Sequence, residues 1–288
     1  MVTAAFLNSP AVRTWLDGVL PAWTLLDHDS VAALRYGSGP RAQAIRLARD
    51  LSPAELAQSA VTRNTLVLLR AASAGAGLKL TAAGNLSRAV VAEMVALFEW
   101  PAFDRDQAFR LLKVINEPDF TPLFFVRHLA QTAGLVRRRK GHLRLTQAGR
   151  QAVQHPPPAM QALLFNIAFR ELDLGYFGLN LQGNWPQADL GIVLWSLSVA
   201  ANDWESSQRL TRLCTIPNDG VVAATWDVAT AVTNARMLQP LMWFGLLEHR
   251  EERVPGQSFG NRFYRKAPLF DRFLAFDVAL EMTQGRQH

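Results

Sequence analysis

Cysteine is almost absent from this 288-residue chain, which contains one, Cys214. A single cysteine excludes a disulfide framework within the chain, and a cysteine-based zinc site would need several more ligands. We therefore expect Cys214 to be a small core residue and the chain to suit a reducing compartment.

Long hydrophobic runs are also absent. The longest apolar stretch, residues 190–201, is far shorter than the roughly 20 residues of a membrane-spanning helix. The N-terminus lacks a basic region followed by an apolar run, so no secretory signal is expected. These features predict a cytoplasmic protein that does not associate with a membrane.

Recognisable catalytic motifs are missing as well. There is no phosphate-binding Gly-rich loop ending in Lys-Ser/Thr, no dinucleotide fingerprint and no His-Glu-X-X-His, and the six histidines are scattered. Two close acid pairs, Glu171 with Asp173 and Asp203 with Glu205, leave an enzymatic role open, although solvated or capping acids are the more common occurrence. We expect no catalysis, no cofactor and no metal.

What the chain has in quantity is apolar material and positive charge. Hydrophobic residues make up 49%, with 16 Phe and 8 Trp to fill a core, and the length suggests about two domains. The net charge is +6. A basic balance favours acidic partners such as nucleic acid.

Acidic residues are absent from residues 120–170, which contain eight Arg or Lys. The densest part, residues 137–142, follows an apolar helical pattern that begins at Thr121-Pro122 and ends at Gly134. It precedes Leu143-Arg144-Leu145-Thr146, which alternates like a strand. Helix, strand, basic tip and strand in this order are typical of a winged helix.

This segment supplies the candidate binding residues. The hairpin cations can neutralise phosphates, and the polar residues of the preceding helix can approach the major groove. The predicted nucleic-acid-binding residues are Arg127, His128, Gln131, Arg137, Arg138, Arg139, Lys140, His142 and Arg144. The alternative is a hairpin that docks on an acidic protein partner or only supports assembly.

The pattern Leu-Lys/Arg-Leu-Thr-X-Ala-Gly occurs twice, at residues 78–84 and 143–149. We interpret both copies as a strand-to-helix turn in which Thr caps the helix that follows. A second charged hairpin is expected at residues 245–265, with a turn at 254–260. Its mixed charges favour packing or dimerisation over DNA binding, so it would be a diverged winged-helix unit.

The predicted fold is mainly α with short β-hairpins. We expect a helical N-terminal region at residues 1–75, with short helices at Ser30–Leu34 and Arg41–Asp50. A winged-helix domain with a basic wing follows at 76–154. The proline-rich segment 155–158 leads to a C-terminal helical domain at 159–288, which contains the diverged unit.

The segments LKLTAAGNL (78–86) and GLVRRRKGHLRLTQAG (134–149) also carry a family resemblance. They resemble the C-terminal region of the plasmid-borne ORF-three-like family, a group of uncharacterised bacterial proteins. There, a similar turn precedes a similar basic hairpin. The resemblance covers residues 76–153 and implies a bacterial or mobile-element setting. The small mixed domain that usually precedes this region in that family is not evident here.

The sequence thus predicts a non-catalytic DNA-binding protein, such as a transcriptional regulator or a mobile-element factor. A protein-interaction or assembly module is the alternative. A homodimer is an expectation from fold analogy alone.

Overall fold

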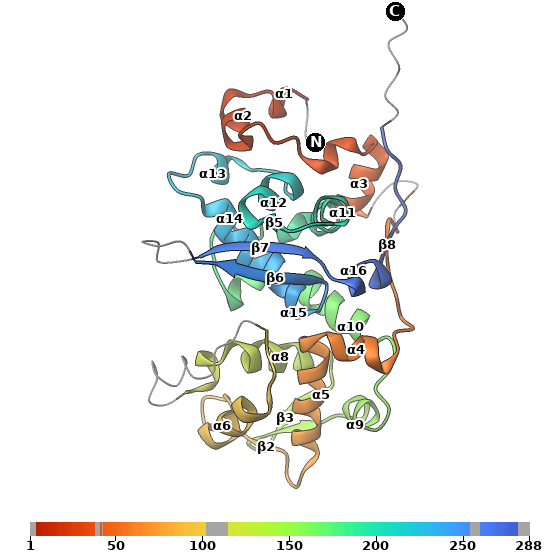
Figure 1. Ribbon diagram of the computed structural model, residues 1–288. Helices are drawn as coiled ribbons and strands as arrows, with labels where there is room; N and C mark the ends of the chain where they lie inside the picture. Colours follow the sequence, from red (N-terminus) through yellow and green to blue (C-terminus); the bar gives the residue numbers. More distant parts are fainter. Residues whose placement is uncertain (1–3, 38–40, 42, 102–114, 254–259, 282–288) are drawn as a thin grey trace, which may run out of the picture. The chain divides into compact units, whose positions relative to one another are not determined.

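The computed structural model describes residues 4–37, 41, 43–101, 115–253 and 260–281. The described chain is mainly helical with small antiparallel sheets, as the sequence predicts. Within these residues no helix combines the length and the apolar character needed to cross a bilayer. The chain divides into two compact units (Figure 1).

Unit 1 comprises residues 1–48, 174–242 and 246–288. Its helices are α1 (Ala4–Leu7), α2 (Pro10–Leu16), α3 (His28–Tyr36), α11 (Leu190–Ala200), α12 (Ser207–Cys214), α13 (Asp219–Val222), α14 (Val228–Thr233), α15 (Gln239–Trp243, of which residue 243 belongs to unit 2) and α16 (Pro268–Phe273). Short helical turns are η1 (Ala22–Leu25), η4 (Leu174–Phe177), η5 (Gln187–Asp189) and η6 (Asn234–Leu238). Its strands are β1 (Ile45–Leu47), β5 (Glu205–Ser206), β6 (Leu247–Glu252), β7 (Asn261–Lys266) and β8 (Leu274–Phe276).

Unit 2 comprises residues 49–173 and 243–245. Its helices are α4 (Pro53–Gln58), α5 (Ala60–Ser73), α6 (Arg88–Leu97), α8 (Thr121–Thr132), α9 (Gln147–Gln154) and α10 (Met160–Asn166), with the turns η2 (Glu117–Asp119) and η3 (Ile167–Glu171). Its strands are β2 (Leu78–Lys79), β3 (Val136–Arg139) and β4 (His142–Leu145).

This division differs from the one expected from sequence. Helix α5 packs on α8, α9 and β4, so it belongs with the basic hairpin rather than with an N-terminal region. Residues expected to be helical at Arg41–Asp50 include the strand β1, which pairs with β8 near the C-terminus, Arg46 opposite Ala275. The N-terminal residues therefore share unit 1 with the end of the chain.

Both expected hairpins form, and each gains a third strand. In unit 2 the sheet order is β2-β4-β3, with Leu78 opposite Leu143. In unit 1 the order is β5-β7-β6, with Glu205 opposite Tyr264. In each sheet the strand that comes first along the chain lies beside the last one. Most of the expected turn of the second hairpin lies outside the described residues.

The two copies of the repeated motif differ. In the second copy, Thr146 caps α9, since its Oγ1 accepts a hydrogen bond from Gly149 N at 3.1 Å, as expected. In the first copy, Thr81 begins a closed turn instead, with its N–H bonded to Asn85 O at 2.7 Å. Helix α6 starts only after Ser87. The first copy is therefore a strand followed by a turn.

Candidate nucleic-acid interface

The β3–β4 hairpin is closed by two residues with positive φ, Lys140 (+48°) and Gly141 (+72°). Such two-residue loops match the right-handed twist of the paired strands. Arg137 lies opposite Arg144, and Arg139 lies opposite His142. The tip therefore extends a twisted ribbon whose strand residues alternate between two faces.

One face of the hairpin is apolar and the other is cationic. Val136, Leu143 and Leu145 are buried. Arg137 and Arg139 are exposed on the opposite face, as the alternation requires. Lys140 is exposed at the tip, and His142 is half-buried with Nδ1 3.0 Å from Lys140 O.

None of the cations of this hairpin forms an ion pair with a carboxylate among the residues that the structure describes. The second hairpin is the opposite case. There, Arg265 pairs with Glu248 at 2.6 Å and Arg250 with Glu252 at 3.3 Å. Both guanidinium groups also lie over the Trp204 ring, at 4.7 and 4.9 Å. The cations of the first hairpin thus have no carboxylate partner among the described residues, while Arg250 and Arg265 of the second are paired with carboxylates of the same hairpin.

Arg138 stands apart from its neighbours. It shares the β3 face of the buried Val136, and its guanidinium lies against Gly84, where a Cβ atom would be 2.5 Å from Nη1. Gly84 has a φ of +83°. The positive charge of Arg138 acts against the burial that raises the pKa of the Glu117 carboxyl. Arg138 therefore lies on the side of the hairpin that carries the apolar residues.

Helix α8 is placed differently from the sequence expectation. Arg127 is 1% exposed and forms an ion pair with Glu117, which is 0% exposed. Its Nη1 donates to Gln131 Oε1 at 3.0 Å. Arg127 and Gln131 are expected to form one polar surface of the helix, but Arg127 lies in the interior. Its guanidinium does not reach the surface.

Glu117 is held by the backbone as well. Leu86 N–H donates to its Oε2 at 2.6 Å. Burial raises the pKa of the Glu117 carboxyl, while this hydrogen bond and the Arg127 guanidinium act against the shift. No local sequence pattern predicts this pair. The position of Glu117 directly before Pro118 indicates only the end of a helix.

His128 and Gln131 are half-buried on α8. The Nδ1 of His128 lies 2.7 Å from Phe124 O, and burial lowers the pKa of its ring. The half-exposed stripe of α8 therefore consists of Phe124, His128 and Gln131. Of the predicted residues, the structure gathers the hairpin cations on one ribbon and separates Arg127 from them.

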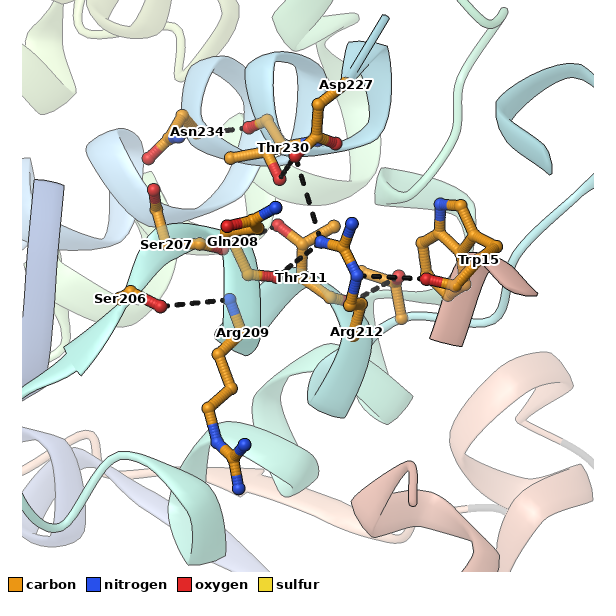
Figure 2. A network of polar contacts seen from close by, with 11 residues as sticks. Trp15, Ser206, Ser207, Gln208, Arg209, Thr211, Arg212, Asp227, Thr230 and Asn234 are labelled. Carbon is orange, nitrogen blue, oxygen red and sulfur yellow. Dashed lines mark hydrogen bonds and ion pairs between the residues drawn. The ribbon is translucent and has the colours of Figure 1, made fainter. Parts of the chain in front are cut away.

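A polar network in unit 1 is a second candidate site (Figure 2). Arg212 Nε donates to Trp15 O at 2.9 Å, and Thr230 Oγ1 donates to Asp227 Oδ2 at 2.8 Å. Arg212 and Asp227 are 3.8 Å apart. Asp227 also caps α14, so its carboxylate joins α12 to α14, while Arg212 reaches α2 through Trp15 O. This arrangement stabilises the helices and does not resemble a catalytic constellation.

The remaining candidates have simpler roles. Cys214 is buried, as expected, and burial raises the pKa of its thiol. Glu205 pairs with Arg209 at 3.1 Å, one turn along the chain. Across the described ranges, no group of three or more His, Cys, Asp or Glu side chains could hold a metal ion.

Comparisons with known proteins concern mainly unit 2. Residues 57–158, from the end of α4 to the segment after α9, match the family described as the Y4jL N-terminal domain. The uncharacterized protein y4jL of Sinorhizobium fredii (strain NBRC 101917 / NGR234) is 36% identical over 112 residues, which cover 39% of this chain and 50% of that protein. The chain thus spans half the length of this curated relative. No solved structure matches. The region that carries the basic hairpin is therefore similar to an uncharacterised bacterial domain, which supports the expected resemblance at this coarser level.

Proposed function

We propose that unit 2 is a winged-helix domain that binds duplex DNA without catalysis, using the β3–β4 hairpin as a basic wing. The order of elements supports this proposal, since α8 leads directly into a hairpin whose last strand pairs with an earlier one. The observation that carries it is the contrast between the two hairpins. The exposed cations of the first form no ion pair within the described residues, whereas Arg250, Arg265 and Lys266 of the second are paired with carboxylates. Regulation of transcription or a mobile-element role would fit such a module.

The wing contacts the phosphate backbone, because Arg137, Arg139 and Lys140 are exposed. Phosphate contacts position a protein without reading sequence. Arg127 is not part of this proposal, since its guanidinium is buried against Glu117. His128 and Gln131 are half-exposed residues of α8, a helix that contacts β3.

A salt titration of duplex binding tests the proposal. Three phosphate contacts give a slope of log K against log salt of about −3, and non-specific binding with a Kd of about 10⁻⁶–10⁻⁴ M at physiological salt is expected. The triple variant Arg137→Gln, Arg139→Gln, Lys140→Gln should lose most of the affinity and flatten the slope. The matched control Arg13→Gln, Arg46→Gln, Arg49→Gln removes the same charge from exposed positions elsewhere. Equal losses of duplex affinity in both triple variants would show that only the net charge matters, and would refute the role of the hairpin as a wing.

An acidic protein partner is the competing function, because unpaired cations on a ribbon also fit a carboxylate surface. The ratio of absorbance at 260 and 280 nm of freshly purified protein separates the two. Nucleic acid that co-purifies supports the wing. Recovery of a stoichiometric acidic protein with no nucleic acid supports the alternative.

A further inference from the structure

A pocket of about 250 Å³ lies beside the cationic face of the β3–β4 hairpin, within unit 2. One wall is formed by the end of α5 and the loop after it, and the other by residues of the hairpin and of α9. The residues of the first wall are Ala72, Ser73, Gly75, Ala76 and Gly77. Four arginines line the pocket, Arg137, Arg139, Arg144 and Arg150, and its lining contains no acidic residue. Such a set is complementary to a compact anion.

The sheet brings three of these arginines together. Arg137 and Arg139 are two positions apart on β3 and so project to the same face. Arg144 lies directly opposite Arg137 on β4. The fourth, Arg150, comes from α9 and is directed toward the hairpin, where its Nη1 donates to Leu145 O at 3.3 Å.

The loop of residues 73–77 closes the other side because it contains glycines. Gly75 and Gly77 have φ values of +50° and +91°. A Cβ atom at Gly77 would overlap the Leu143 carbonyl oxygen and lie 3.0 Å from Arg144 Cγ. The backbone of the loop can therefore approach the hairpin only without a side chain at this position.

This arrangement is unfavourable by itself. Like charges directly opposite each other on adjacent strands destabilise a sheet. In addition, Arg144 Nε is buried, and no group in the described part of the chain accepts a hydrogen bond from it. A tetrahedral oxyanion between the four side chains would relieve both costs, since it supplies negative charge and several acceptor atoms.

We propose that this pocket binds a phosphate group, held by Arg137, Arg139, Arg144 and Arg150. If the phosphate belongs to a nucleic-acid backbone, the inference rests on the proposed function and fixes one phosphate at the side of the wing rather than at its tip. If it is a free phosphate, the pocket is a separate ligand site. Arg150, which was not among the residues predicted from sequence, distinguishes this pocket from the hairpin as a whole.

The experiment compares Arg150→Gln and Arg144→Gln with Arg49→Gln in the full chain. Arg49→Gln removes the same charge from an exposed position of unit 2 that does not line the pocket. Inorganic phosphate binding is measured by isothermal titration calorimetry, and binding of a 20-base-pair duplex by fluorescence anisotropy. Each pocket variant should weaken phosphate binding by about tenfold or more, as expected for a lost charge-assisted hydrogen bond, while Arg49→Gln leaves it unchanged.

The two ligands separate the possible outcomes. Loss of both phosphate and duplex binding in the pocket variants identifies a backbone phosphate. Phosphate binding that depends on Arg150 without any duplex binding upholds the pocket and refutes the proposed function. Duplex binding that is insensitive to Arg150→Gln and Arg144→Gln, with no binding of inorganic phosphate, overturns the pocket and leaves the wing intact. Failure to bind either ligand overturns both.

Folding of the variants is checked independently. Arg150→Lys keeps the charge and should retain more phosphate affinity than Arg150→Gln. Thermal unfolding with and without inorganic phosphate gives a second readout, because a ligand that binds only the folded state raises the melting temperature. The wild-type protein should show this rise and Arg150→Gln should not. Equal rises in both would contradict the proposal.

Discussion

Arg127 and Glu117 are charged residues in the interior of unit 2, where the cost of removing them from water is large. Their mutual attraction offsets part of this cost, and the Leu86 N–H adds a hydrogen bond to the carboxylate. The pair joins α8 to η2 and to the turn that follows β2. Its role is therefore structural, and it positions the helix that leads into the β3–β4 hairpin.

Replacing Glu117 by Ala should lower the free energy of unfolding by about 3–5 kcal/mol, because Arg127 would remain buried without its partner. The double variant Glu117→Leu, Arg127→Met should lose much less, since no charge is left uncompensated. Urea denaturation measures both. The control is Asp271→Ala, which breaks a pair with Lys266 in which the Asp271 side chain is 66% exposed, and it should cost less than about 1 kcal/mol. A single Glu117 variant as stable as this control would contradict the role given to the pair.

His128 gives a prediction about pH. Burial lowers the pKa of its ring in the folded protein, and the Phe124 carbonyl acts against this shift. The unfolded chain therefore binds a proton at higher pH than the folded one. The contribution of His128 to the free energy of unfolding is fully present above a pH of about 6.5. It decreases as the pH falls toward the lower pKa that His128 has in the folded protein.

NMR titration of the His128 ring should accordingly give a pKa below the ordinary histidine value of about 6.5. His128→Gln should reduce the loss of stability between neutral pH and the folded pKa. His249 has a pKa lowered by burial too, so His249→Gln measures its separate share. A His128 pKa equal to or above about 6.5 would contradict the burial of the ring.

At the scale of elements, the contact of α9 with the start of the β3–β4 hairpin depends on one glycine. Gly149 lies in the first turn of α9, and a Cβ atom there would overlap the Leu135 carbonyl oxygen. Thr146 reinforces this close approach, because its Oγ1 donates to Gly134 O at 2.6 Å and accepts from Gly149 N. The second repeat thus needs glycine for packing rather than for an unusual φ.

Gly149→Ala should destabilise the protein by about 1–3 kcal/mol, the usual cost of overpacking. Alanine favours helices more than glycine does, so any gain in helix propensity works against this loss. Gln151→Ala, at an exposed position of the same helix, should be close to neutral. Thermal or urea unfolding of both variants tests the packing. A stabilised Gly149→Ala variant would show that α9 can move away from Leu135 without cost.

At the scale of the whole molecule, unit 2 is completed by residues from late in the chain. Trp243–Gly245 belong to it although the rest of the unit ends at Asp173. Phe244 is buried, its ring lies 5.5 Å from that of Phe165, and its carbonyl accepts a hydrogen bond from Gln161 Nε2 at 2.8 Å. Unit 2 therefore does not correspond to a single continuous segment.

A fragment of residues 49–173 should be less stable than the same residues in the full chain, because it lacks Trp243 and Phe244. In the full chain, Phe244→Ala should cost about 3–5 kcal/mol, the usual loss for a buried phenylalanine. Trp226→Ala is the control, since Trp226 is 56% exposed in unit 1. Hydrogen exchange resolved to unit 2 measures the effect. A fragment as protected as the full chain would show that these late residues contribute little.

The sequence by itself determined the elements whose signals are local. Ser52 and Glu55 form a capping box, with both reciprocal hydrogen bonds present. Gly134 ends α8 with a φ of +65°, and the β3–β4 hairpin occupies the expected residues. These features depend on groups a few residues apart, so a pattern of side chains is enough to specify them.

The tertiary structure alone decided which distant segments meet. Residues 45–47 became a strand because β8 was available to pair with them, and Arg127 became buried because Glu117 could accompany it. Arg150 joined the hairpin cations through the docking of α9 on Leu135. Such contacts depend on the summed packing of segments far apart in the chain, and the periodicity of any one segment does not contain that information.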